Sequence, residues 1–331
     1  MKNEFENFLT HPAGVNFGSI TLSDGEREFY RDLNDEIIML CRSLPESTQT
    51  NALMFLMQYT GMSFGDELDF FRHYPVPTWS IIYWLIQSRV RDKKLKQEDI
   101  KNAIAGHAMA MTLHSMDDHL TDHEMPVTHL TLLLRGQAWM IMNNAFEDLA
   151  CEVDGGHEIL RGLIDDYFKG IFSSAEMETL DHYCELFRKQ MATGLIAPAL
   201  LAERMTTPDE LSSDIMTAYG SFGIAWRLLD DIKDIEIDMM KSLHTSIYVC
   251  LPQDLKKCWD KYTEEEPMHR ESYNRAIWDH IRENGVIDKV VEKIRDELES
   301  AVSIADSHRL TGLANEFRAL LAPLAFGQNS L

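Results

Sequence analysis

The stretch that decides the fold is AWRLLDDIKDIEIDMMK, residues 225–241, in which aspartates interrupt an otherwise apolar pattern. Residues four apart lie one turn apart on the same helix face, so Asp230, Asp234 and Asp238 form an acidic stripe. Apolar side chains at positions 228, 229, 232 and 235 occupy the opposite face. Because an unpaired carboxylate in a core costs free energy and neighbouring carboxylates repel, the stripe predicts a helix whose acidic face is neutralised by a bound partner.

A second acidic cluster lies earlier in the chain, in TLHSMDDHLTDHE at residues 112–124. His114, Asp118 and Asp122 share a helix face there, with Asp117 beside Asp118. Two facing stripes of carboxylates suit magnesium, which prefers carboxylate and water oxygens and is usually shared with substrate phosphates. The alternative is a solvated charged face, which more often includes lysine and glutamate. Both clusters lie in strongly apolar segments, and this favours the metal site.

Helix starts recur along the chain. SDGE at residues 23–26 and SSAE at 173–176 have the form of a capping box, and TPDE at 207–210 places a proline at the first helical position. Apolar residues spaced three and four apart then predict helices over residues 177–205 and 211–235. No strand-like alternation or internal repeat occurs, so we expect an all-α protein.

The chain length supports one large helical domain. The 331 residues are 45% hydrophobic, which provides a sizeable core, and no segment has the composition of a linker. We expect a single domain over residues 1–331, with the acidic motifs inside residues 50–255 and C-terminal helices from 270–331 capping the bundle.

The charge of the chain excludes several partners. The net charge of −23 repels phosphate backbones and anionic membrane surfaces, so nucleic acid is not an expected partner. No apolar run is long enough for a membrane span, and the first residues lack the pattern of a signal peptide, so we expect a cytoplasmic protein.

The five cysteines show no CxxC spacing, which argues against a zinc or disulfide framework.

Four segments resemble one known family in the correct order. FGIAWRLLDDIKD, residues 222–234, resembles the second aspartate-rich motif of the trans-isoprenyl diphosphate synthases, and MDDHLTD, residues 116–122, resembles their first. RKQMATG at 188–194 resembles the lysine–threonine segment of that family. MKSLHTSIYVCLP at 240–252 resembles the lysine and T-L-P stretch that follows the second motif.

This resemblance implies the class I isoprenoid synthase fold, a large helical bundle around a deep central cavity. It implies three magnesium ions that bridge the carboxylates to an allylic prenyl diphosphate. Loss of the diphosphate then leaves an allylic carbocation in an apolar pocket, and the prenyl group is transferred to an acceptor. A homodimer is a further implication of the resemblance.

The resemblance also implies roles for individual residues. Lys189, Arg227 and Lys241 are the expected catalytic contacts of the leaving diphosphate, with Arg188 and Arg72 as further substrate-binding residues. Arg227 stands where the family usually has glutamine. The expected magnesium ligands are Asp117, Asp118, Asp122, Asp230, Asp231 and Asp234.

The chain departs from the family pattern mainly in the part that binds the acceptor. The first motif reads D-D-x-x-x-D, with Thr121 at the usual position of the third aspartate. HEMPVTH, residues 123–129, replaces the segment in which the family has two arginines. GDELDFFRHYP, residues 65–75, carries acids where the family binds isopentenyl diphosphate through cations. The sequence therefore retains the ionising half of the site and lacks the usual acceptor half.

Three alternatives remain open. A class I terpene cyclase uses a double bond of the same substrate as acceptor, and Asp230, Asp234 and Asp238 occupy the three ligand positions of its second motif. A zinc site at His119 and His123 and a non-catalytic helical binding protein are lesser alternatives. A phosphohydrolase of the His-Asp type is not supported, because none of the 13 histidines is followed by aspartate.

Overall fold

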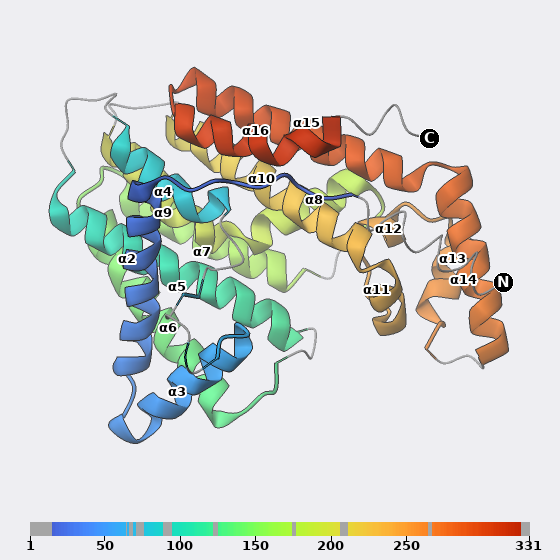
Figure 1. Ribbon diagram of the computed structural model, residues 1–331, viewed down its shortest axis with the longest axis horizontal. Coiled ribbons are helices and arrows are strands. Elements are labelled where there is room, and N and C mark those ends of the chain that lie inside the picture. Colours follow the sequence, from blue (N-terminus) through green and yellow to red (C-terminus); the bar gives the residue numbers. More distant parts are fainter. Residues whose placement is uncertain are drawn as a thin grey trace.

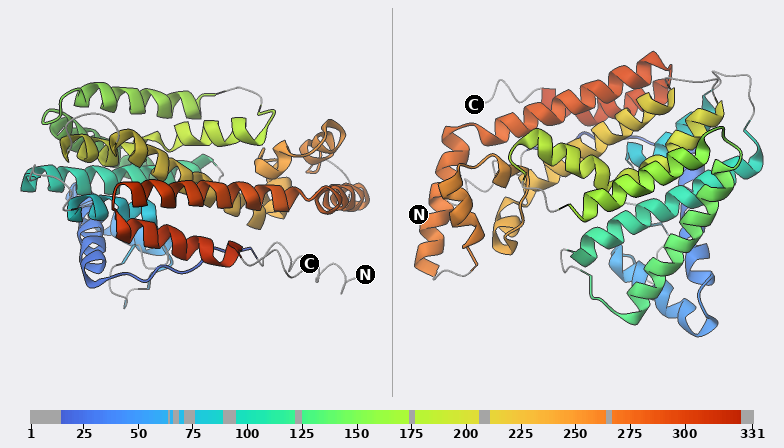
Figure 2. Two further views of the ribbon diagram at one scale, coloured as in Figure 1. Left: turned by 90° about the horizontal axis from the view of Figure 1, so that it is seen from above. Right: turned by 180° about the vertical axis from the view of Figure 1, so that it is seen from behind.

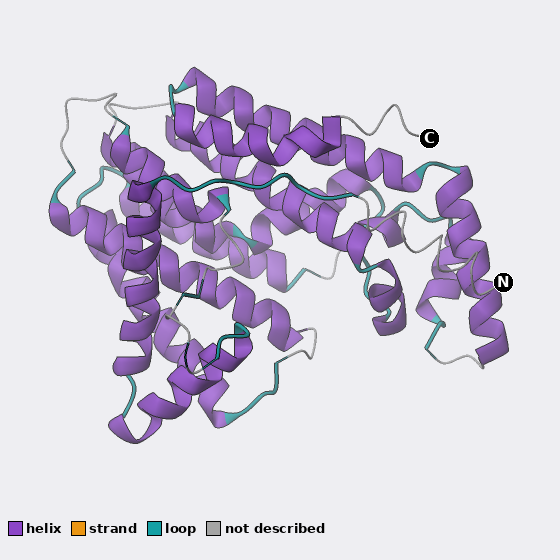
Figure 3. Cartoon of the chain, viewed as in Figure 1, coloured by secondary structure: helices purple, strands orange, loops and turns teal. Residues whose placement is uncertain are grey.

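The computed structural model describes residues 15–63, 65, 69–70, 76–88, 95–121, 125–173, 177–205, 211–263 and 267–325. These residues form fifteen helices, α2 to α16, and no strand (Figures 1 and 3), so the all-α prediction is confirmed. None of these helices combines the length and apolarity needed to cross a membrane. The bounds are α2 Asp24–Arg42, α3 Glu46–Tyr59, α4 Pro77–Gln87, α5 Gln97–Thr121, α6 His129–Ala150, α7 Gly156–Ile171, α8 Leu180–Gln190, α9 Ala192–Met205, α10 Leu211–Lys233, α11 Ile235–Lys241, α12 Ser246–Val249, α13 Gln253–Asp260, α14 Pro267–Glu283, α15 Val286–Ser307 and α16 Thr311–Ala325.

The bundle is organised around α5 and α10, which carry the two acidic clusters at their C-terminal ends. Helix α5 packs against α6, α9 and α2, whereas α10 packs against α15, α9 and α4. The antiparallel pair α15 and α16 lies along α10, and α11 to α14 extend from one end of the bundle (Figures 1 and 2). Of the C-terminal helices, α15 is thus a full member of the bundle.

Close packing fixes the position of α5. Its middle turns consist largely of small residues, and Gly106 lies against the ring of Phe146 on α6. A Cβ atom at Gly106 would come within 2.3 Å of Phe146 Cε1, so glycine is required for this approach. The contact fixes the position of α5 along its own axis relative to α6, and therefore the position of its C-terminal acidic residues.

One expected helix, over residues 177–205, is divided in the structure. The capping box at residues 23–26 is present, since the Ser23 side chain accepts from the Glu26 amide and Glu26 accepts from that of Ser23. The segment 177–205, however, forms two helices that separate at Met191, because α8 buries only Tyr183 and Cys184 whereas α9 is buried almost all round. Helix α8 is capped by Thr179, whose side chain accepts a 3.2 Å hydrogen bond from the His182 amide. The starts expected at 174–176 and 207–210 lie outside the described residues.

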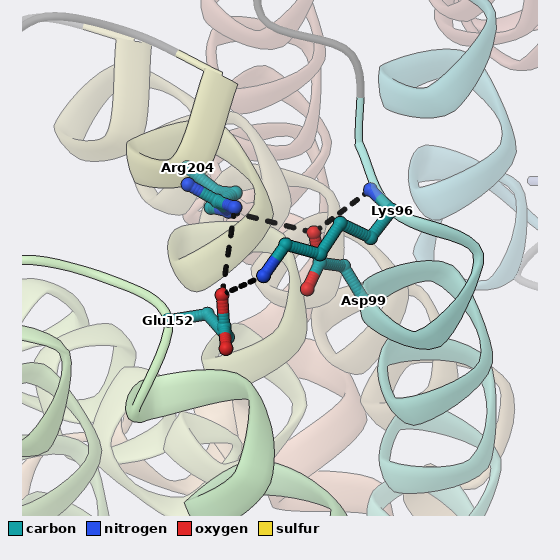
Figure 4. Close-up of polar contacts among 4 residues, drawn as sticks. All are labelled: Lys96, Asp99, Glu152 and Arg204. Atoms are coloured by element: carbon teal, nitrogen blue, oxygen red, sulfur yellow. Dashed lines mark hydrogen bonds and ion pairs between the residues drawn. The ribbon is translucent and has the colours of Figure 1, made fainter.

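An ion-pair network joins the N-terminal end of α5 to α9 and to the turn after α6 (Figure 4). Asp99 is buried and accepts a 2.9 Å hydrogen bond from the backbone amide of Lys96 and a 3.4 Å contact from Arg204 Nε. Arg204 Nη2 also lies 3.6 Å from Glu152 Oε2, and the Lys96 ammonium pairs with the same carboxylate. Arg204 therefore supplies the cation for a buried carboxylate whose charge would otherwise be unpaired.

We expect Arg204→Met to lower the free energy of unfolding by about 3 kcal/mol, because it leaves the buried Asp99 carboxylate without its cation. Lys96→Met removes a cation from the same network, but at an exposed pair, and should cost no more than about 1 kcal/mol. Urea unfolding followed by circular dichroism measures both variants. Equal losses for the two variants would contradict this assignment.

A carboxyl pair connects α2 to α16. Glu26 and Glu316 are both buried, and Glu316 accepts hydrogen bonds from the Ser80 hydroxyl and from Trp84 Nε1, both on α4. Burial, together with the adjacent Glu26 carboxyl, raises the pKa of Glu316 to about 8. A side-chain hydrogen bond between the two carboxyls contributes to this rise in the pKa of Glu316.

This pair predicts a pH-dependent stability. Because the folded-state pKa of Glu316 lies above its ordinary value of 4.5, the stabilisation is complete below about pH 4.5 and is lost as the pH rises through about 8. Between about pH 5 and about pH 8 the melting temperature of the wild type should therefore fall more steeply than that of Glu316→Gln. Thermal unfolding at a series of pH values tests this, and parallel curves for the two proteins would contradict it.

Candidate active site

A cavity of about 510 Å³ lies between α5 and α10 and is closed by α2, α3, α4, α8 and α9. Its lining is mostly apolar and aromatic along the inner parts of these helices. The histidine, aspartate and arginine side chains of the lining come from the C-terminal halves of α5 and α10. The lining residues are Ile37, Leu56, Tyr59, Thr60, Phe70, Val76, Thr78, Trp79, Met111, Thr112, His114, Ser115, Met116, Asp118, His119, Phe187, Met191, Gly194, Tyr219, Phe222, Gly223, Trp226, Arg227 and Asp230.

The structure places one aspartate from each cluster on this cavity. Asp118 lies in the last turn of α5 with 47% of its side chain exposed, and Asp230 lies near the end of α10. The two clusters, far apart in the sequence, therefore meet at the same end of the cavity. Helix periodicity predicts the acidic face within each motif, and the family resemblance implies that the two faces meet across the cavity.

Arg227 bridges the two clusters. Its Nη1 lies 3.9 Å from Asp118 Oδ1, and its Nε lies 3.1 Å from Asp231 Oδ1. The same Nε donates a 2.9 Å hydrogen bond to the Tyr183 hydroxyl, and the guanidinium sits 5.7 Å from the centre of the Phe187 ring. A cation that is mostly buried and held on several sides is therefore fixed at the acidic end of the cavity.

The carboxylates carry more negative charge than Arg227 neutralises. Partial withdrawal from water raises the pKa of Asp230 to about 6, and the carboxylates of Asp234, Asp231 and Asp118 oppose the lowering effect of Arg227. Burial, together with the Asp231 carboxylate, raises the pKa of Asp238 to about 8. Carboxylate oxygens with uncompensated charge suit divalent cations such as magnesium. Within the described residues no three such groups form a ready-made metal site by themselves.

The other aspartates of the second cluster do not line the cavity. Asp231 is 1% exposed, and its Oδ2 accepts a 2.9 Å hydrogen bond from the amide of Ser246, the first residue of α12. Asp234 is half-buried at the break between α10 and α11, and Asp238 is buried in α11. Asp231 thus anchors Arg227 and the segment at Ser246, whereas Asp230 remains open to a ligand.

Asp117 has partners that the sequence reasoning missed. Arg135 on α6 donates from Nε to its Oδ1 at 2.5 Å and from Nη2 to its Oδ2 at 2.9 Å. The Tyr167 hydroxyl on α7 donates to the same Oδ2 at 2.6 Å. These bonds raise the pKa of Arg135, and burial with the Asp117 bond raises the pKa of Tyr167. The available sequence signal was the isolated arginine inside the apolar run LTLLLRGQAW.

The expected cationic contacts, apart from Arg227, are not part of the described lining. Arg188 Nη2 lies 2.8 Å from both oxygens of the buried Glu297 on α15, and Lys189 lies 4.0 Å from Glu185. Lys241 is exposed at the end of α11. Arg72 and Asp122 lie outside the described residues, as does His123 of the expected zinc pair.

Comparison with solved structures gives the fold. The sequence itself matches no protein-family model and no curated protein. The geranylgeranyl pyrophosphate synthase of Lactobacillus brevis superposes with a TM-score of 0.64 at 11% identity, over 89% of this chain and 97% of that chain. The heptaprenyl diphosphate synthase of Staphylococcus aureus gives 0.63 at 13% identity, over 92% and 98%.

A third solved structure was determined with ligands. The geranylgeranyl pyrophosphate synthase of Corynebacterium glutamicum, in complex with isoprenyl diphosphate and magnesium, gives a TM-score of 0.61 at 13% identity, over 88% of this chain and 98% of that chain. All three cover nearly their whole length at low identity, so the likeness concerns the entire architecture. The chain has the fold of the trans-isoprenyl diphosphate synthases, with a sequence far removed from theirs.

Proposed function

We propose that the protein is a magnesium-dependent enzyme that ionises an allylic prenyl diphosphate and transfers the prenyl group to an acceptor. The observation that carries this proposal is the cavity itself. Its apolar and aromatic part ends at three charged side chains. Asp118 belongs to the first acidic cluster, and Arg227 and Asp230 belong to the segment that carries the second. The fold shared with diphosphate synthases, one of them solved with isoprenyl diphosphate and magnesium, supports the same chemistry.

Each part of the cavity has a task in this reaction. Asp118 and Asp230 would hold magnesium, which supplies Lewis-acid stabilisation of the leaving diphosphate. Arg227 donates to the diphosphate oxygens as the C–O bond breaks and the electron pair leaves with the oxygen. The rings of Trp79, Phe187 and others of the lining face the allylic cation and exclude water from it.

A class I terpene cyclase is the second candidate. The aromatic side chains that line the cavity come from α3, α4, α8 and α10 and, with Phe70, from the segment before α4, so a cation would meet rings on several sides. Such an enclosure suits a reaction in which the cation migrates along its own chain. Of the expected acceptor segment, residues 65–75, the structure describes only residues 65, 69 and 70, and these do not discriminate between the two candidates.

Product analysis decides between the candidates. The protein is incubated with magnesium and geranyl, farnesyl or geranylgeranyl diphosphate, each with and without isopentenyl diphosphate. A longer prenyl diphosphate that forms only with isopentenyl diphosphate establishes chain elongation. A hydrocarbon or alcohol released without it establishes the cyclase. Absence of magnesium-dependent diphosphate binding would refute both.

A further inference from the structure

The side chain of Asp117 points away from the cavity although Asp118, its neighbour, lines it. Along α5 the lining residues fall on one face, at positions 111, 112, 114, 115, 116, 118 and 119. Successive helix residues are rotated by about 100°. Asp117 therefore lies on the opposite face, with Leu113, which is buried in the core one turn earlier.

On that face the Asp117 carboxylate is fully engaged. Arg135 and Tyr167 make three hydrogen bonds to its two oxygens, at 2.5, 2.9 and 2.6 Å. Its side chain is 20% exposed, and Tyr167 is buried. A planar guanidinium that binds both carboxylate oxygens is among the strongest pairings available to aspartate. The group of Asp117, Arg135 and Tyr167, here called the α5 clamp, is also electrically neutral.

We propose that Asp117 is a positioning residue, and that the magnesium ligands of the first acidic cluster begin at Asp118. The clamp ties the last turn of α5 to α6 and α7 and so fixes the direction in which Asp118 enters the cavity. This assignment also accounts for the spacing of the motif. In the sequence Asp118 and Asp122 are four residues apart, the spacing of one helix face, and Asp117 does not share that spacing.

The inference rests on the proposed function. Its test measures magnesium binding and does not depend on turnover. The full chain is titrated with magnesium in the presence of inorganic pyrophosphate, and the melting temperature is recorded. The midpoint of the stabilisation is compared among the wild type, Asp117→Asn, Arg135→Gln, the double variant and Asp118→Asn. The double variant keeps the clamp electrically neutral. Asp117→Asn alone leaves the Arg135 cation without its carboxylate partner, at the position next to Asp118.

We expect Asp118→Asn to raise the magnesium midpoint by about a hundredfold or to abolish the stabilisation. Asp117→Asn should raise it by about tenfold, the size of effect typical of groups that orient a ligand. The double variant should return the midpoint to within about threefold of the wild type, because its two amide side chains can still hydrogen-bond across the same contact and leave no unpaired charge. A role confined to folding would lower the melting temperature of the single variants and leave their midpoints unchanged, which would overturn the proposal.

Two further outcomes would also overturn it. A double variant as impaired as Asp118→Asn would make Asp117 a metal ligand. If Asp117→Asn does not fold, Tyr167→Phe supplies the test, because a ligand role for Asp117 predicts a lower midpoint once the competing hydroxyl is removed, whereas positioning predicts a higher one. A wild type without any magnesium-dependent stabilisation by pyrophosphate would instead refute the proposed function, and this assignment with it.

Discussion

Asp118→Asn and Asp230→Asn should each reduce turnover of an allylic prenyl diphosphate by about a thousandfold, which corresponds to about 4 kcal/mol of transition-state stabilisation. Both side chains line the cavity and come from different helices. Asparagine preserves shape but removes the charge that holds a divalent cation. The measurement is single-turnover release of diphosphate at saturating magnesium.

The fold should survive both changes, because each side chain lies at the cavity surface and neither is enclosed by the core. Asp230→Asn should even stabilise the protein slightly at neutral pH, since partial burial, together with the neighbouring carboxylates, raises the pKa of Asp230. Asp254→Asn, at an exposed position on α13, is the matched control for loss of one negative charge. Unchanged turnover in both cavity variants would contradict the proposed function.

Asp231 illustrates why the motif does not assign equal roles to its aspartates. The family resemblance makes Asp231 a ligand, but the structure buries it against Arg227 and the Ser246 amide. Asp231→Ala should therefore remove both a charge and a buried anchor. A loss of activity in that variant does not separate the two roles, whereas Asp230→Asn does.

The sequence predicted the helix class from local periodicity, whereas the meeting of the two clusters was implied by the family resemblance of the two motifs. The spacing of Asp230, Asp234 and Asp238 also predicted one continuous acidic face, but the helix breaks at Asp234 and buries Asp238. The break depends on how α11 packs, which no local pattern encodes. The separation of α8 from α9 at Met191 has the same origin.

The partners of charged residues were less predictable, because they come from distant parts of the chain. Arg135 is 18 residues from Asp117, and Tyr167 is 50 residues from it. Glu297 lies 109 residues from Arg188 in the sequence and binds its guanidinium, and Arg188 is not among the described lining residues of the cavity. A motif can rank a residue type as suitable for diphosphate or metal, but only the packing shows whether its charge is already engaged.

Substitution of Arg227 should also have a large effect, both on catalysis and on stability. Arg227→Gln introduces the residue that the related family usually carries, yet we expect kcat/KM to fall by about a hundredfold or more because the fixed cation at the acidic end is lost. The free energy of unfolding should also fall by about 3 kcal/mol, since Asp231 is 1% exposed and loses its ion-pair partner.

These two components can be separated with a second destabilised protein. Arg204→Met removes the cation from another buried carboxylate, Asp99, in a network that does not line the cavity. It should show a similar stability loss with kcat/KM within about threefold of the wild type. If Arg227→Gln and Arg204→Met lose equal activity, instability explains both and Arg227 has no special part in the reaction. If only Arg227→Gln loses activity, its guanidinium acts on the substrate, because the two variants share the energetic defect and differ in their distance from the cavity.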